Sequence, residues 1–179
     1  MKKFICLCLA LTMALSLAAC GKKAPAETTA PAASVEGTME ELVNKIIDNR
    51  PVEFSGGSIV IDLADTSEDG QWIVKSYTGL EDASVLTDAA AYEPMMSSIA
   101  FSLVTVRVAP GADSKAVAES MKSGVDPRKW ICVEADDLLV AGCGDVVMLI
   151  MVSTTGGMTA QSFVDAFQSV AGRTCDFVI

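Results

Sequence analysis

A lipobox near the start of the chain separates a short leader from the part that must fold. This motif consists of the consecutive residues Leu17, Ala18, Ala19 and Cys20. Two lysines and an apolar run over residues 4–17 precede the cysteine, which is the pattern of a secretory signal. The run is shorter than the ~20 apolar residues that a membrane-spanning helix needs. We therefore predict a signal peptide over residues 1–19 and a lipid on the thiol of Cys20.

The mature chain would begin at Cys20 and is of normal length for one domain. Residues 20–36 are rich in alanine, proline and threonine and show no apolar periodicity, so we expect a flexible tether. A fully extended tether of this length would span on the order of 50 Å. Residues 37–179 are expected to form a single domain.

The charge of the chain and its lack of histidine exclude several classes of function. Removal of the two leader lysines would leave 11 basic residues against 23 acidic ones, a net charge of −12. This balance disfavours nucleic-acid partners, which are bound through clusters of lysine and arginine. Because the chain has no histidine, it cannot contain a serine–histidine or cysteine–histidine nucleophile or a histidine-containing zinc site.

Apolar side chains at helical spacing, together with capping residues, predict four helices. The first starts at a capping box formed by Thr38 and Glu41 and ends before Pro51. The second has Asp65 as its N-cap and closes at Gly79, a residue suited to a left-handed C-cap. The expected helices cover residues 39–50, 66–78, 114–124 and 159–170.

Strand patterns dominate the second half of the chain. Residues 99–108 give the clearest strand, which we expect at the centre of a sheet with both faces partly covered. Residues 138–141 and 146–152 are expected to pair as a hairpin. Three further segments leave their structure open: residues 58–63, 84–92 and 130–134.

The order of these elements predicts an α+β fold. The C-terminal half is expected to run strand, helix, strand, strand, helix, and two helices precede it. An antiparallel sheet with helices packed on one face satisfies this order.

Several blocks of the sequence carry a family resemblance. They are Glu93-Pro94-Met95-Met96, the strand at residues 99–108, the sequence VDPRKWICVEAD at residues 125–136, and GDVV at residues 144–147. With these blocks the chain resembles the family named domain of unknown function 4358, over roughly residues 38–170. The family consists of small lipoproteins, mostly from Gram-positive bacteria. The resemblance implies an exported, lipid-anchored α+β domain and supplies no catalytic residue.

The acidic segment before the second expected helix matches half of a calcium-binding loop. Asp65, Ser67 and Asp69 occupy its first, third and fifth positions, and Gly70 the sixth. The twelfth position, which needs a bidentate glutamate, is Ser76. We therefore favour an acidic helix cap over a calcium site, and we predict no cofactor.

A second acidic group raises the possibility of catalysis. Glu134, Asp136 and Asp137 lie close to Trp130 in the sequence, as a carboxylate pair beside a sugar-stacking aromatic does in a glycosidase. Acids in a turn are more often solvated, and tryptophan more often lies in a core. We therefore predict no catalytic residue and keep a carboxylate-based hydrolase of envelope or glycan substrates as the alternative.

Sulfur-containing residues permit two further predictions. Cys6 and Cys8 would leave with the signal, so three thiols would remain beside the lipidated cysteine: Cys132, Cys143 and Cys175. We expect these three to be reduced, buried, small apolar residues, with one disulfide as the alternative. Met95 and Met96 could form an adaptable contact surface, although most such methionines fill gaps in a core.

Together these features predict a bacterial lipoprotein at the extracytoplasmic face of the cell membrane, held there by the lipid on Cys20. We expect its domain to be monomeric and non-enzymatic, and to bind a protein, peptide or envelope component.

Overall fold

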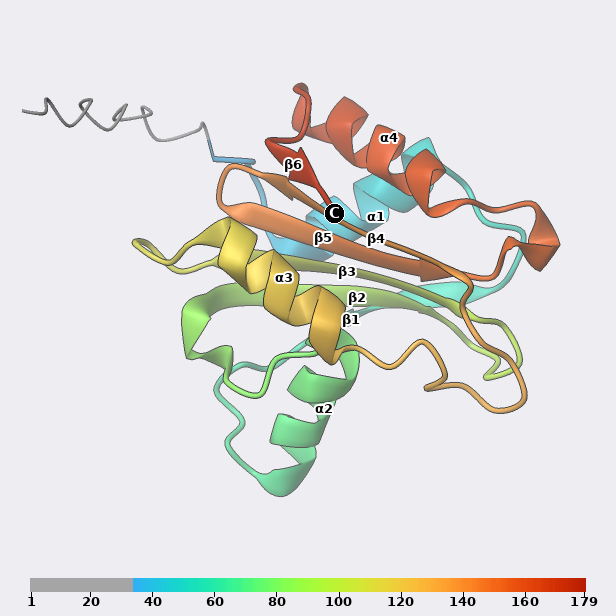
Figure 1. Ribbon diagram of the computed structural model, residues 1–179, viewed down its shortest axis with the longest axis horizontal. Coiled ribbons are helices and arrows are strands. Elements are labelled where there is room, and N and C mark those ends of the chain that lie inside the picture. The colour runs from blue at the N-terminus through green and yellow to red at the C-terminus, as the bar shows by residue number, and fades with distance from the viewer. Residues whose placement is uncertain (1–33) are drawn as a thin grey trace, which may run out of the picture.

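The computed structural model describes residues 34–179 and contains one sheet with helices on both sides (Figure 1). Its helices are α1 (Met39–Asn49), α2 (Glu68–Thr78), α3 (Ser114–Gly124) and α4 (Ala160–Ala171). Its strands are β1 (Gly56–Val60), β2 (Leu86–Pro94), β3 (Phe101–Val108), β4 (Asp137–Cys143), β5 (Val146–Val152) and β6 (Phe177–Val178). The predicted signal peptide, the lipobox and the tether up to residue 33 lie outside the described residues.

The strands follow the order β1-β2-β3-β5-β4-β6, and each neighbouring pair is antiparallel. The α+β class, the antiparallel sheet, the β4–β5 hairpin and the central position of β3 are therefore confirmed. None of the helices within residues 34–179 is long and apolar enough to cross a membrane.

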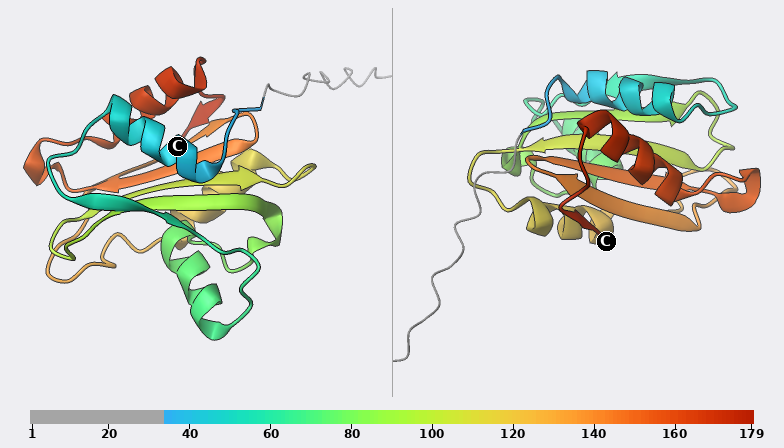
Figure 2. Two further views of the ribbon diagram at one scale, coloured as in Figure 1. Left: turned by 180° about the vertical axis from the view of Figure 1, so that it is seen from behind. Right: turned by 90° about the horizontal axis from the view of Figure 1, so that it is seen from above.

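The helices cover both faces of the sheet, which corrects the prediction of a single covered face (Figure 2). α1 and α4 pack on one face, over a core centred on Phe101 and Phe163. α2 and α3 pack on the other face, where Val104 and Met121 are buried. The reason lies in β5, whose seven residues are all apolar and buried. A strand without a polar side needs cover on both faces.

Two strands carry too weak a pattern to be identified from sequence. β2 contains Ala89, Ala90 and Ala91, and alanine has a low strand propensity. All three are buried, because their small side chains let helices lie close to both faces of the sheet. β6 has only two residues. The open segment at residues 130–134 forms no strand.

The predicted helix caps are confirmed except at the start of α2. Thr38 and Glu41 form the capping box of α1, and Gly79 closes α2 with a φ of 75°. Asp113 caps α3. The exception is the N-cap of α2, which is Ser67 rather than Asp65, because the Ser67 hydroxyl accepts the backbone N–H of Gly70.

Packing begins at Ser34, earlier than the predicted boundary at Gly37, because Arg107 holds this segment against the sheet. The Arg107 guanidinium donates to Ser34 Oγ at 3.0 Å and to the carbonyls of Val35 and Gly37 at 2.8 Å each. It also pairs with Asp145 Oδ2 at 2.6 Å. Val35 is buried as a result. The chain thus enters the domain beside the C-terminal end of β3.

Candidate ligand-binding groove

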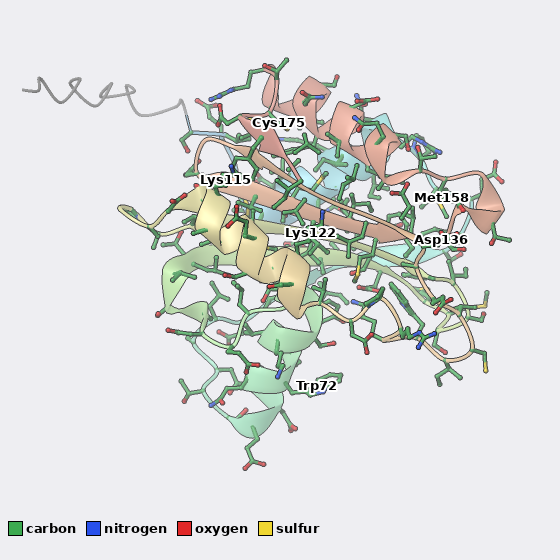
Figure 3. The ribbon with its side chains drawn as sticks, viewed as in Figure 1. Trp72, Lys115, Lys122, Asp136, Met158 and Cys175 are labelled. Carbon is green, nitrogen blue, oxygen red and sulfur yellow. The ribbon has the colours of Figure 1, made fainter. Side chains whose placement is uncertain are left out.

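A groove of about 780 Å³ lies between α2, the end of β2 and the loop that follows α3. Four large apolar side chains on its walls are exposed: Trp72 by 68%, Met95 by 79%, Met96 by 59% and Ile59 by 37%. Trp72 projects away from the body of α2 (Figure 3). Exposed apolar side chains that gather in one place are a general feature of contact sites. We call this feature the Lys129 groove, after the residue in its floor.

Two glycines make a tight contact beside the groove, and one of them, Gly124, lines it. A Cβ atom on Gly124, at the end of α3, would collide with the carbonyl group of Gly79, at the end of α2. The two helix ends therefore meet backbone to backbone. The loop that carries Lys129 starts at this contact.

A nearly buried ion pair of Lys129 and Glu93 forms the floor of the groove. Lys129 Nζ lies 2.7 Å from Glu93 Oε1 and 3.0 Å from Ser102 Oγ, and Ser102 donates its hydroxyl proton to the same Glu93 oxygen. The side chains of Lys129 and Glu93 are 14% and 12% exposed. The ammonium also lies 4.7 Å from the ring centroid of Tyr77 and 5.3 Å from that of Trp130, within cation–π range.

The geometry of this cluster does not suit nucleophilic attack by Ser102. Ser102 is fully buried and donates its hydroxyl proton to a carboxylate. A lysine that activates a serine has to be neutral, whereas Lys129 is paired with Glu93. The hydrogen bonds of Glu93 within residues 34–179 all go to Oε1, which leaves Oε2 as an acceptor in a residue that lines the groove.

Tyr77 lies beside the floor of the groove. Its ring is half-buried, and burial raises the pKa of its phenol, with a further increase from the negative charge of Glu93. Both effects disfavour the phenolate, so Tyr77 presents a neutral hydroxyl to the groove over the ordinary pH range.

The three carboxylates proposed above as catalytic candidates have three separate partners. Glu134 pairs with Arg128 at 2.7 Å. Asp136 accepts the backbone N–H and the hydroxyl of Thr154, each at 2.7 Å, which lowers the pKa of this carboxyl. Asp137 accepts the N–H of Ala160 at the start of α4. The structure does not bring two of these groups together across a cleft.

The calcium candidates serve as turn and cap residues. Hydrogen bonds from the side chain and the backbone of Ser67 lower the pKa of Asp65. Ser67 in turn uses its hydroxyl to cap α2. Among residues 34–179, no group of three or more histidine, cysteine, aspartate or glutamate side chains converges as metal ligands do.

The three cysteines within residues 34–179 are free, but they differ in exposure. Cys143 is buried, and burial raises the pKa of its thiol. Cys175 is half-buried, and burial, with a smaller contribution from Cys143, raises its pKa to about 12. Cys132 is exposed and lies in a loop, with a φ of 64°. The prediction that all three are buried is therefore wrong for Cys132.

The sequence indicated Met95, Met96 and Trp130 as residues of interest. It did not indicate the ion pair of Glu93 and Lys129, which lies next to them. Glu93 and Lys129 are 36 residues apart, and neither belongs to a local motif with the other. The one available signal was that both lie in the blocks that carry the family resemblance.

Comparison with known proteins gives no match to a family model, to a curated protein or to a solved structure.

Replacing Glu93 should shift the titration of Tyr77. We expect Glu93→Gln to lower the pKa of Tyr77 toward its ordinary value without reaching it, because burial remains. Ultraviolet absorbance in an alkaline titration would report this, in a Tyr92→Phe background that leaves Tyr77 as the sole tyrosine. Glu134→Gln serves as the control and should leave the pKa unchanged. An unchanged pKa in Glu93→Gln would contradict the described geometry.

Thiol counting should separate the three mature cysteines. We expect one thiol, that of Cys132, to react at once with a chromogenic reagent in the native protein. Cys143 and Cys175 should react only after denaturation, because burial and a raised pKa leave little thiolate. Cys132→Ser should abolish the fast reaction. Two rapidly reacting thiols in the native wild type would refute this assignment.

Proposed function

We propose that this chain is a lipid-anchored, extracytoplasmic binding protein whose ligand occupies the Lys129 groove. The observation that carries the proposal is the exposed apolar rim around a paired, nearly buried lysine and glutamate. Leaving Trp72, Met95 and Met96 in water is unfavourable unless a ligand covers them. The groove also has the volume and the few polar groups that are typical of ligand sites.

The point where the chain enters the domain supports display from a membrane. Arg107 holds Ser34 at the C-terminal end of β3, whereas Ser102 and Glu93 lie at the opposite end of the sheet. The eight residues of β3 put roughly 25 Å between these ends. Figure 1 shows the start of the described chain on one side and the β2–β3 connection on the other. A tether attached at Ser34 would direct the groove away from the lipid surface.

Binding is preferred over hydrolysis because of where the carboxylates lie. Glu134, Asp136 and Asp137 are each engaged by a different neighbour. The hydrolase alternative therefore has no pair of facing acids to support it.

The lipid anchor is tested at its attachment residue. We expect Cys20→Ala to block cleavage of the signal at this site and to abolish metabolic labelling with fatty acid. Wild type should stay with membranes in high salt, because two acyl chains anchor stably and salt removes only electrostatic attachment. Cys132→Ser should behave as wild type in both assays. Recovery of wild type in the soluble fraction would contradict the anchor.

The groove is tested by site-specific photocrosslinking in cells. A photoreactive residue in place of Met96 should capture the ligand, whereas one in place of Val178, also exposed but on β6, should not. Trp72→Ala should remove the adduct, because loss of a central tryptophan weakens binding by on the order of 2 kcal/mol, about 30-fold in Kd. Equal capture from both positions would show that the groove is not the binding site.

A further inference from the structure

β1 lies at an edge of the sheet, and its outer side is open. Within residues 34–179 it pairs only with β2, at the end of the strand order. The N–H of Ile61 donates to the carbonyl of Ala89. Because ladder bonding alternates along an antiparallel pair, Gly57 and Ile59 also bond inward.

The intervening residues have unpaired backbone groups as a consequence. The N–H and C=O groups of Gly56, Ser58 and Val60 point away from β2, at the spacing of a strand. Within residues 34–179 these groups make no hydrogen bond. Three donors and three acceptors at this spacing match the main chain of another extended strand.

The β1 edge also lacks the features by which proteins usually block strand pairing. Its sequence, GGSIV, contains no charge and no proline, and the pairing with β2 shows no bulge. The opposite edge of the sheet differs, because β6 has only two residues and is too short to template a partner.

Side-chain direction along β1 connects this edge to the groove. Ser58 faces α1, where its hydroxyl donates to Glu40. Its neighbour Ile59 therefore faces the opposite side of the sheet and lines the Lys129 groove. A strand added beside β1 would place every second side chain on the same face of the sheet as Ile59, the face on which Trp72 and Met95 line the groove.

We propose that the β1 edge binds an extended peptide segment of a partner protein, with alternate apolar side chains entering the Lys129 groove. This proposal rests on the proposed function and adds the class of ligand and its mode of binding. The segment is neutral or basic, because the predicted net charge of −12 repels acidic chains. The main chain supplies affinity, and the apolar pockets select side chains.

The test uses a phage-displayed library of linear dodecapeptides, panned against the mature lipoprotein in detergent. We expect enriched peptides with apolar residues at alternate positions. Val60→Pro should weaken their binding about tenfold or more, because proline removes an outward N–H while the ladder to β2 is kept. Val60→Thr retains that N–H and should bind as wild type. A thermal melt of each variant checks folding.

Hydrogen exchange keeps the proposal testable if Val60→Pro does not fold. In wild type, the enriched peptide should slow exchange at the amides of Gly56, Ser58 and Val60. Exchange at these amides that is unaffected by bound peptide would overturn the proposal.

The remaining outcomes separate this proposal from the function on which it rests. Binding lost in Trp72→Ala but unchanged in Val60→Pro would overturn the added strand and leave the groove as the ligand site. No enriched peptide, or binding that depends on neither residue, would overturn both. Concentration-dependent dimerisation that Val60→Pro abolishes would assign the edge to a second copy of this chain and overturn the peptide.

Discussion

Burial of the central strands on both faces is the constraint on which the rest of this structure depends. All seven residues of β5 are apolar and buried, and β3 beside it is buried at all but one position. Neither strand has a side that can face water. The helices are therefore shared between the two faces, with α1 and α4 on one and α2 and α3 on the other. Two separate cores result, and the groove forms at the margin of the second.

The two ends of the sheet differ in the contacts that cover them. At one end, Arg107 ties Ser34, the Val35 and Gly37 carbonyls, and Asp145 together. At the other end, the connections between strands are longer, and the loop after α3 carries Lys129 over the sheet. Its charge is neutralised by Glu93, so the floor is polar but not strongly charged. Apolar side chains around such a floor suit a ligand with both main-chain and apolar groups.

The open β1 edge and the groove are adjacent because α2 covers only part of its face. Trp72 extends from α2 beyond the covered area, and Ile59 lies uncovered on the neighbouring strand. An unblocked edge is a hazard for a protein, since exposed edges pair with one another. An open β1 edge beside the Lys129 groove is consistent with the proposal that this edge binds a partner strand.

Local sequence determined the elements whose signals are local. The capping box at Thr38, the left-handed glycine at position 79, the β4–β5 hairpin and the strand at β3 each depend on residues close together in the chain. The α+β class follows from their order. β2 could not be predicted from the sequence, because its three consecutive alanines have a low strand propensity. Their place in a strand depends on the helices that pack on both faces of the sheet.

Only the tertiary structure decided the distribution of helices over the two faces, the exposure of Cys132 and the site itself. Glu93 and Lys129 become partners through the path of the chain around α3, and nothing within either segment specifies the other. The carboxylates from Glu134 to Asp137 look like one acidic group in sequence, yet each is engaged by a different neighbour. Sequence periodicity indicates which side of a helix or strand is apolar. Contacts between distant segments depend on how the helices and strands pack against one another in the fold.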